Sequence, residues 1–448
     1  MNSTFTYEEA LEFAHQLLSI KSNNLLTDLE EKIFRGCWED RDYVDIAETL
    51  GYSTGRITEV GSQLWSKLST ALGERISKKT FRQPLRREWE KQYPTSKTRL
   101  SEFLIAPQSL KDALNHDFDY YVERPLIEQH CLLEILKPGC LLRIKAPWQT
   151  GKTELVSKLM YHIAQKGYQT AVFNLRDATK EDFENLDKFL QWFCTLLANR
   201  LELIYSVEEH WHKSLGNSKI KCRNYFEKYL LVGDSPLILC LDEVDRIFPY
   251  REIASEFLGM LRTWHEDSKT RQLWRQFRLI IAHSEVYTEV DINQSPFNAG
   301  CEITLTDFNQ EQVLYLAQQY KLDWNMTQVV QLMAMIGGHP FLVNEAFKKV
   351  AQLGMTFEEL LQISHKTWGI YYYHLERHWR NLQSNPELAD AFQKIVLAST
   401  AVEFHSGLNQ SIIVKLNDLG LVKLLSNGVI PRYELYRHYY RNRFQNSL

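Results

Sequence analysis

The sequence lacks the segments that direct a chain into or across a membrane. It contains no run of about 18 apolar residues, the length that a membrane-spanning helix needs. Its first residues, MNSTFTYEEALEF, carry acidic side chains where a secretory signal would be basic and then apolar. The seven cysteines are scattered, odd in number and never spaced C-x-x-C, which argues against a disulfide framework or a zinc knuckle. We therefore expect a cytoplasmic protein with reduced thiols and no membrane partner.

A dominant charge of one sign is also lacking, and so are repeats and low-complexity tracts. The chain has 52 Lys and Arg against 56 Asp and Glu, a formal net charge of −4. The molecule as a whole therefore does not attract nucleic acid or anionic lipid, and such a partner would need a local basic patch. Of the 448 residues, 44% are hydrophobic and 24% are charged, which predicts several ordinary globular domains.

Apolar residues that recur at spacings of three and four predict a helical domain at residues 1–74. Within the segment YVDIAETLGYSTGRITEVGSQLW, Gly51 is placed to end one helix and Ser53 to cap the next. Two helices joined by such a short turn are typical of a helix-turn-helix. Residues 75–116 begin with a strongly basic stretch that contains helix-breaking prolines such as Pro84, so we expect a basic linker there.

Between residues 117 and 303, four short apolar runs alternate with helical patterns. The runs CLLRIKA, TAVFNL, PLILCLD and RLIIAH are continuous, which is typical of parallel strands buried on both faces. Residues 304–385 show helical patterns alone, and residues 386–448 combine helices with two short strands joined at an Asn-Gly turn, which predicts a winged helix. We therefore predict a multidomain α/β protein: an all-α helix-turn-helix domain, a parallel-sheet core, a helical lid and a C-terminal winged helix.

The segment APWQTGKT, residues 146–153, joins a predicted strand to a predicted helix, as a P-loop does. In that order, backbone N–H groups at the start of the helix cradle phosphate, where the helix dipole favours negative charge. Lys152 would reach the β- and γ-phosphates of ATP, and Thr153 would place its hydroxyl on Mg²⁺. Ala146 replaces the usual first glycine and Pro147 lacks an N–H, but the phosphate-facing donors lie further along the loop. The residues that we expect to bind the nucleotide here are Trp148, Gln149, Thr150, Gly151, Lys152, Thr153 and Glu154.

Polar residues at the ends of two later strands complete the predicted site of a P-loop NTPase core. The strand PLILCL runs into Asp242 and Glu243, which would orient Mg²⁺ and activate a water molecule as general base. A buried strand that simply stops at two surface acids is the alternative. His283 and Ser284, at the end of RLIIAHS, would sense the γ-phosphate, although a strand end that merely turns polar fits equally well. In GGHP, Pro340 could present a rigid face to adenine, or could belong to an ordinary turn between helices.

These motifs, in this order, resemble those of a STAND NTPase, an AAA-like signal-transduction ATPase. The segments YVERP, RLIIAHSEVY, DINQSPFNAG, IGGHPFLV and GLVKLLSNGVIPRYELYR resemble a bacterial AAA-like family. The segment LGYSTGRITEVGSQLWSKLSTALGE is similar to the amino-terminal domain of vWA-MoxR-associated proteins. The resemblance implies that Arg124 and Pro125 lie near adenine, that Pro340 packs on the base, and that the winged helix clamps a closed ADP state. Arg246 and Arg278 are both candidates for an arginine finger.

We therefore expect a molecular switch that binds ATP or ADP with Mg²⁺, hydrolyses ATP slowly, and serves bacterial signalling or defence. The switch would meet a protein partner or assemble with itself in the ATP state, with residues 1–74 as the docking module. The alternative is a nucleotide-gated DNA-binding protein, either a transcriptional regulator or a mobile-element ATPase. A third possibility is a nucleotide sensor that binds ADP without turnover.

The charge distribution bears on the DNA alternative. Between Asp28 and Glu59, nine acidic residues face four basic ones, a balance that repels phosphate. The basic stretch that follows could grip a DNA backbone or remain a solvated linker. His374 and His378 are one helical turn apart without a third ligand nearby, so we expect core or surface histidines rather than metal ligands.

Overall fold

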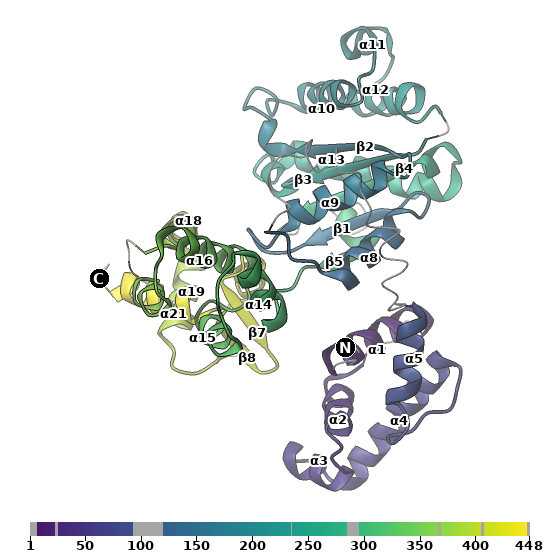
Figure 1. Ribbon diagram of the computed structural model, residues 1–448. Helices are drawn as coiled ribbons and strands as arrows, with labels where there is room; N and C mark the ends of the chain where they lie inside the picture. The colour runs from purple at the N-terminus through teal and green to yellow at the C-terminus, as the bar shows by residue number, and fades with distance from the viewer. Residues whose placement is uncertain are drawn as a thin grey trace. The chain divides into compact units, whose positions relative to one another are not determined.

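The computed structural model describes eight stretches of the chain, which separate into two compact units, Met1–Asn115 and His116–Leu448. Figure 1 shows the helices and strands of each unit. The described residues are 7–22, 26–92, 120–233, 235–284, 295–364, 366, 369–404 and 407–445. Residues 93–116 of the predicted linker lie outside them, as do residues 285–287 and 291–294, which belong to two of the motifs quoted above.

Within its described residues, the first unit is entirely helical. Its core joins aromatic side chains of α2, of α4 and of the segment before α5: the ring centroids of Trp65 and Phe81 are 4.7 Å apart, and those of Phe34 and Phe81 are 5.1 Å apart. Burial of such large rings supplies most of the favourable free energy of packing in a small domain. The helices are α1 (Tyr7–Ser22), α2 (Asp28–Trp38), α3 (Tyr43–Leu50), α4 (Thr54–Leu72) and α5 (Arg82–Gln92).

The turn between α3 and α4 confirms the predicted helix-turn-helix punctuation. Gly51 ends α3 in the left-handed conformation, with φ of 71°, which glycine adopts without steric cost. Ser53 caps α4, because its side-chain oxygen accepts a hydrogen bond from the N–H of Arg56 at 3.3 Å. Both residues therefore act as the sequence pattern predicted.

The stretch 75–92, which we predicted to be linker, is folded. It forms α5, and Ile76, Phe81 and Leu85 are buried in the core of the first unit. Pro84 does not prevent the helix because it lies in its first turn, where the backbone N–H groups have no partner within the helix. The prolines and basic residues were therefore misleading signals of a linker.

The second unit contains a five-stranded sheet in the order β2-β3-β4-β1-β5. All neighbouring strands are parallel, and Figure 1 shows helices on both faces. β3 and β4 are buried along their whole length, which confirms the prediction from their continuous apolar runs. The short strand β5 was not predicted. The strands are β1 (Leu141–Lys145), β2 (Gln169–Asn174), β3 (Leu237–Asp242), β4 (Phe277–His283) and β5 (Cys301–Thr304).

Two hydrophobic clusters cover the faces of this sheet. On one face, side chains from alternate strand positions pack against α8 and α9; on the other, they pack against α10, α12 and α13. The α-helices of this part are α8 (Pro125–Ile135), α9 (Lys152–Ala164), α10 (Leu186–Arg200), α11 (Val207–Lys213), α12 (Ser218–Tyr225) and α13 (Arg251–Thr270). The shorter turns are η2 (Leu175–Asp177), η3 (Phe226–Leu230), η4 (Val244–Ile247), η5 (Leu273–Gln276) and η6 (Pro296–Asn298).

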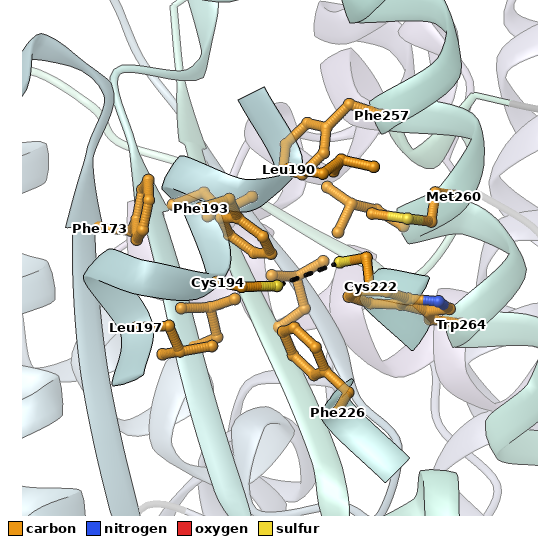
Figure 2. Close-up of a cluster of buried hydrophobic side chains, with 14 of the residues drawn as sticks. Phe173, Leu190, Phe193, Cys194, Leu197, Cys222, Phe226, Phe257, Met260 and Trp264 are labelled. Carbon is orange, nitrogen blue, oxygen red and sulfur yellow. Dashed lines mark hydrogen bonds between the residues drawn. The ribbon is translucent and has the colours of Figure 1, made fainter. Parts of the chain in front are cut away.

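The larger cluster is dense in aromatic side chains (Figure 2). The ring of Phe226 lies 5.9 Å from that of Phe193 and 4.5 Å from that of Trp264. The thiols of Cys194 and Cys222 meet within it at 3.6 Å, and burial raises the pKa of the Cys194 thiol. These cysteines behave as small buried hydrophobic residues.

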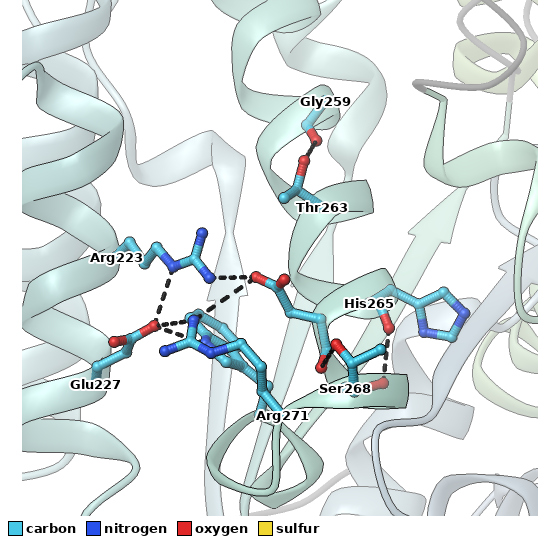
Figure 3. Close-up of polar contacts among 10 residues, drawn as sticks. Arg223, Glu227, Gly259, Thr263, His265, Ser268 and Arg271 are labelled. Atoms are coloured by element: carbon cyan, nitrogen blue, oxygen red, sulfur yellow. Dashed lines mark hydrogen bonds and ion pairs between the residues drawn. The ribbon is translucent and has the colours of Figure 1, made fainter.

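A polar network at the edge of this cluster ties α12 to α13 (Figure 3). Glu227 accepts hydrogen bonds from Arg223 at 3.0 Å, from Arg271 at 2.6 Å and from the indole of Trp274 at 2.7 Å. Partial burial raises the pKa of Glu227, but the hydrogen bonds from Arg271 and Arg223 outweigh it and lower the pKa to about 2. Arg223 of α12 also donates to Asp267 of α13 at 2.5 Å, so charge-assisted hydrogen bonds join the two helices.

The rest of the second unit is mainly helical and shares one core. A three-stranded antiparallel sheet, in the order β6-β8-β7, lies near the end of the chain. The assignment of this region as a winged helix stays a prediction, as do the domain boundaries. The helices are α14 (Gln310–Gln319), α15 (Met326–Ile336), α16 (Pro340–Leu353), α17 (Phe357–Ile363), α18 (Tyr372–Gln383), α19 (Pro386–Leu397), α20 (Gln410–Asp418) and α21 (Glu434–Gln445). The strands are β6 (Val402–Glu403), β7 (Val422–Leu425) and β8 (Gly428–Pro431). Among the described residues, no helix has the length and apolar character needed to cross a bilayer.

Candidate functional site

The predicted P-loop connects the end of β1 to the start of α9. Its turn uses left-handed backbone at two positions, Gln149 with φ of 63° and Gly151 with φ of 94°. Gly151 is the N-cap of α9, and no side chain caps the helix there. The first N–H groups of α9 are therefore available to an anionic group at the positive end of the helix dipole.

The side chain of Lys152 is held at this loop by three hydrogen bonds. Its Nζ donates to the carbonyl oxygens of Ala146 at 2.7 Å and Pro147 at 2.9 Å, and to the hydroxyl of Ser284 at 3.1 Å. Burial lowers the pKa of Lys152, although nearby carboxylates, Asp245 above all, act in the opposite direction. The partly desolvated ammonium group is therefore fixed beside the loop. Because it is poorly solvated there, it can attract an anionic group bound at the loop.

The acid pair at the end of β3 reaches the same place. The hydroxyl of Thr153 donates to Oδ2 of Asp242 at 2.8 Å, although β4 lies between β1 and β3 in the sheet. Asp242 is buried, with 1% of its surface exposed, whereas Thr153 is exposed. A carboxylate and a hydroxyl in contact are hard oxygen ligands of the kind that Mg²⁺ prefers, so these residues fit the predicted metal.

Glu243 is engaged with an arginine that the sequence did not single out. Nε of Arg176, in η2, donates to Oε2 of Glu243 at 2.5 Å, and a second guanidinium nitrogen contacts Oε1. Glu243 itself adopts left-handed backbone, with φ of 55°, which is uncommon for a residue other than glycine. This backbone conformation and the two-point ion pair together fix the position of its carboxylate.

A cavity of about 1030 Å³ opens between these groups. The predicted site residues that line it are Trp148, Gln149, Gly151, Lys152, Thr153, Glu154, Asp242, Glu243 and Ser284. Its other lining residues are Asn174, Arg176, Asp245, Arg246, Arg377, His378, Asn381 and Leu419. The cavity therefore combines the ends of β2, β3 and β4 with residues of α18 and of the loop after α20.

The remaining predicted site residues are not among those that line the cavity. Arg124 is buried and supports the loop from outside, because its Nη2 donates to the carbonyl of Thr150 at 3.1 Å. Pro125 is exposed at the first turn of α8. His283 is buried next to Phe297, with ring centroids 4.8 Å apart. The hydroxyl of Thr150 donates to the carbonyl of Pro147 at 2.7 Å, and Pro340 is buried at the start of α16.

The two arginine-finger candidates are separated by the structure. Arg246 lines the cavity. Arg278 lies near the start of β4, where it donates to the carbonyl of Leu136 at 3.4 Å, and His283 is five residues further along the strand. At about 3.3 Å per residue, Arg278 is roughly 16 Å from the phosphate edge of the sheet. Arg278 is therefore not a finger for the cavity of its own chain.

Residues of α18 contact the phosphate loop directly. The imidazole of His374 stacks on the indole of Trp148, with ring centroids 6.0 Å apart, and the guanidinium of Arg377 lies 3.4 Å from the centroid of the same indole. Nδ1 of His374 lies 2.7 Å from Oε1 of Gln149, and its Nε2 lies 2.7 Å from the hydroxyl of Tyr436 in α21. A chain of hydrogen bonds therefore joins the phosphate loop to the last helix.

The loop after α20 touches the same segment from another side. Nζ of Lys145, at the end of β1, forms an ion pair with Asp418 at 2.8 Å. Gly420 approaches so closely that a Cβ built on it would lie 2.7 Å from Cβ of Pro147. The C-terminal part of the unit therefore packs against the phosphate loop through two independent contacts.

Buried histidines near the cavity predict a pH-dependent stability of the second unit. Burial lowers the pKa of His339 to about 4, from an ordinary value of 6.5. Between these values the unfolded chain binds a proton that the folded one does not, so stability falls as the pH decreases. His339→Asn retains an acceptor for the N–H of Leu342, which His339 accepts at 3.5 Å, and removes the titration. Urea unfolding at pH 6.5 and pH 5 should show wild type losing about 1.5 kcal/mol more than the variant; equal losses would contradict this prediction.

The fold and the site together define a P-loop ATPase-like protein. The chain belongs to the AAA-like domain family, which matches residues 110–442. Residues 5–88 match the N-terminal helix-turn-helix domain of vWA-MoxR associated proteins. These matches confirm the family and the N-terminal domain that the sequence motifs suggested.

Comparison with solved structures gives matches at low sequence identity. The Walker-type ATPase of Pyrococcus abyssi superposes with a TM-score of 0.52 at 10% identity, over 72% of this chain and 96% of that one. The ORC2 protein of Aeropyrum pernix gives 0.44 at 14% identity, over 72% and 92%. A STAND protein with a tetratricopeptide repeat sensor from Pyrococcus horikoshii gives 0.35 at 14% identity, over 72% of this chain and 42% of that one. No curated protein matches the sequence.

Proposed function

We propose that this protein is an Mg²⁺-dependent ATP-binding switch that hydrolyses ATP slowly. The observation that carries the proposal is the 2.8 Å contact between Thr153 and Asp242 in the cavity that Lys152 lines. A phosphate loop, a buried lysine and a pair of hard oxygen ligands are the set of groups that phosphoryl transfer from a nucleotide requires. The cavity volume of about 1030 Å³ also suits a nucleotide.

Each residue would have a distinct role. The N–H groups from Gln149 to Thr153 would bind the phosphates, and Lys152 would neutralise their charge. Thr153 and Asp242 would hold Mg²⁺, which polarises the terminal phosphate when it is bound. Glu243 would accept the proton of the attacking water.

Slow turnover follows from the surroundings of Glu243. Its carboxylate is held at two points by Arg176, so an attacking water would have to displace the guanidinium from one of its oxygens. Asp245, another acid of the cavity, accepts the backbone N–H of Ser284 at 2.9 Å, so this carboxylate is also engaged. The described cavity therefore has its candidate base restrained.

Switching is supported by the contacts between the phosphate loop and the C-terminal part of the unit. Bound phosphates would compete with His374 for contact with the phosphate loop. Arg377, on the same helix as His374, lines the cavity. Two arrangements of these contacts would give two states whose balance the nucleotide shifts. Arg124, Pro125 and Pro340 would form the adenine end of the site, as the family resemblance implies, and His283 and Ser284 would sense the γ-phosphate.

We assign the first unit to docking a protein in bacterial signalling or defence. Two of its basic groups are engaged within the unit: Arg56 pairs with Glu59 at 3.0 Å, and Arg82 with Asp40 at 2.9 Å. Two apolar side chains of the helix-turn-helix, Val44 and Tyr52, are about half exposed, at 49% and 50%. Partnered bases and exposed apolar groups suit a protein surface better than a DNA backbone.

The proposal is tested with the purified full chain. Calorimetric titration with ATP and with ADP, with and without Mg²⁺, should show one site per chain, and phosphate release should be slow and Mg²⁺-dependent. Failure to bind either nucleotide would overturn the proposal. Stimulation by double-stranded DNA, with binding that weakens steeply as salt rises, would instead favour the nucleotide-gated DNA-binding protein. ADP retained without turnover would favour a nucleotide sensor.

The restraint on Glu243 predicts the effect of one substitution. Arg176→Ala should raise ATP turnover, because it frees the carboxylate. The ion pair is partly exposed, with 52% of the Arg176 side chain accessible, and such pairs contribute up to about 1 kcal/mol. The expected increase is therefore at most about fivefold. Steady-state phosphate release checks it, with Arg176→Lys as the charge-conserving control; a fall in turnover would mean that Arg176 assists the reaction.

A further inference from the structure

A second group of ligand-type side chains lies far from the phosphate loop, at the opposite edge of the sheet. His130 and Glu134 are one turn apart on α8, and Cys301 is the first residue of β5. One ligand atom from each of the three lies within 4.8 Å of the others. The group borders a groove of about 560 Å³, which Glu134 and Cys301 line.

The spacing of these atoms matches the distances between ligands around one ion. Nε2 of His130 lies 3.8 Å from Sγ of Cys301 and 3.8 Å from Oε1 of Glu134. In a tetrahedral zinc site, atoms bound at about 2.0–2.3 Å are separated by roughly 3.4–3.6 Å. Movements of a few tenths of an ångström would therefore bring the three atoms to bonding distance.

The surroundings leave the group accessible. All three side chains are of intermediate burial. Glu134 is paired with Lys137 at 2.5 Å, but 62% of the Lys137 side chain is exposed, so breaking this pair costs little. Imidazole nitrogen, thiolate sulfur and carboxylate oxygen are together the ligands that zinc accepts, whereas Mg²⁺ takes oxygen ligands.

We propose that His130, Glu134 and Cys301 bind a divalent ion of the zinc type, with a water molecule in the remaining position. The ion would join α8 to β5, the edge strand that pairs only with β1. The backbone of an edge strand such as β5 pairs with a neighbour on one side alone. Bonds to the ion would give this short strand a second attachment, to α8. Because Arg124, the N-cap of α8, contacts the phosphate loop, the ion would secure the helix that supports the loop.

The test uses Co²⁺ as a spectroscopic probe of the reduced full chain. Wild type should bind Co²⁺ with a thiolate-to-cobalt charge-transfer band and the visible spectrum of a tetrahedral ion, and Zn²⁺ should displace it. Cys301→Ser should lose the charge-transfer band, and His130→Ala should weaken binding at least about tenfold. At a Zn²⁺ concentration about 100 times Kd, Tm of wild type should rise by roughly 5 °C, without a rise in Cys301→Ser.

A matched control comes from another histidine–glutamate pair one turn apart on a helix. In α11, Nε2 of His212 lies 4.0 Å from Oε1 of Glu208, and both side chains are largely exposed; among the described residues, no cysteine completes this pair into a metal-binding group. His212→Ala should therefore leave Co²⁺ binding unchanged. Absence of the charge-transfer band in wild type, or its persistence in Cys301→Ser, would refute the site. Both readouts are independent of ATP binding, so the metal site and the proposed switch can fail separately.

Discussion

Glu243→Gln is expected to lower ATP turnover by about 10²–10⁴-fold while leaving ATP binding within about twofold of wild type. Glutamine has almost the same shape as glutamate but cannot accept a proton from water, so the change removes the base with little effect on the shape of the cavity. The position of residue 243 is set by its left-handed backbone, and its amide oxygen can still accept a hydrogen bond from Arg176. The loss should therefore be confined to the chemical step.

Single-turnover phosphate release and calorimetric ATP binding separate the two quantities. Glu208→Gln in α11, outside the cavity, serves as the control for removing one glutamate charge from the unit. Turnover that stays at the wild-type level would remove Glu243 from the role of base. A parallel loss of ATP binding would instead show that the carboxylate contributes to holding the nucleotide.

Lys152→Met is expected to weaken ATP binding by about 10–100-fold. The side chain is buried and positioned by the carbonyl oxygens of Ala146 and Pro147, so its charge acts at short range in a poorly hydrated place. Methionine has a similar length and no charge, and it removes the hydrogen bonds from Lys152 to the carbonyl groups of Ala146 and Pro147, of which the second keeps the hydroxyl of Thr150 as a donor. The variant should therefore lose both the attraction for phosphate and part of the order of the loop.

Fluorescence titration with a labelled ATP analogue measures this effect, and the thermal midpoint without nucleotide reports whether the fold survives. Lys188→Met is a suitable control, because Lys188 is an exposed lysine of α10 paired with Glu184. A folded Lys152→Met protein with wild-type affinity would contradict the assignment of Lys152 to the phosphates. Lys152→Arg should bind with intermediate affinity, because it keeps the charge but not the fit.

The sequence predicted those parts of the site that depend on local order. The P-loop lies between a strand and a helix, and the acid pair ends a strand of the same parallel sheet, so both meet at one edge. The turn at Gly51 and Ser53 was predictable for a similar reason, because each residue acts on backbone within a few positions of itself.

Contacts between distant segments were not predictable from spacing. Gln149 and His374 are separated by 225 positions, and only packing of α18 brings Arg377, His378 and Asn381 to the cavity. His130 and Cys301 are similarly remote, by 171 positions. Asn174 could have been found, because it ends a predicted strand as Asp242 does. β5 was missed because its four residues alternate in exposure and provide no continuous apolar run.

The C-terminal part of the unit packs against the phosphate loop at Gly420 and Pro147. This close packing requires residue 420 to have no side chain. Gly420 has φ of 77° and no room for a Cβ. An alanine at this position would therefore clash with Pro147 and would also strain the backbone. Because Pro147 belongs to the phosphate loop, this clash would displace the residues proposed to bind the phosphates. The side chain of Pro147 cannot rotate aside to relieve the clash, because its ring is closed onto the backbone. Movement of the loop after α20 would therefore shift the backbone of the phosphate loop, and movement of the phosphate loop would shift the loop after α20.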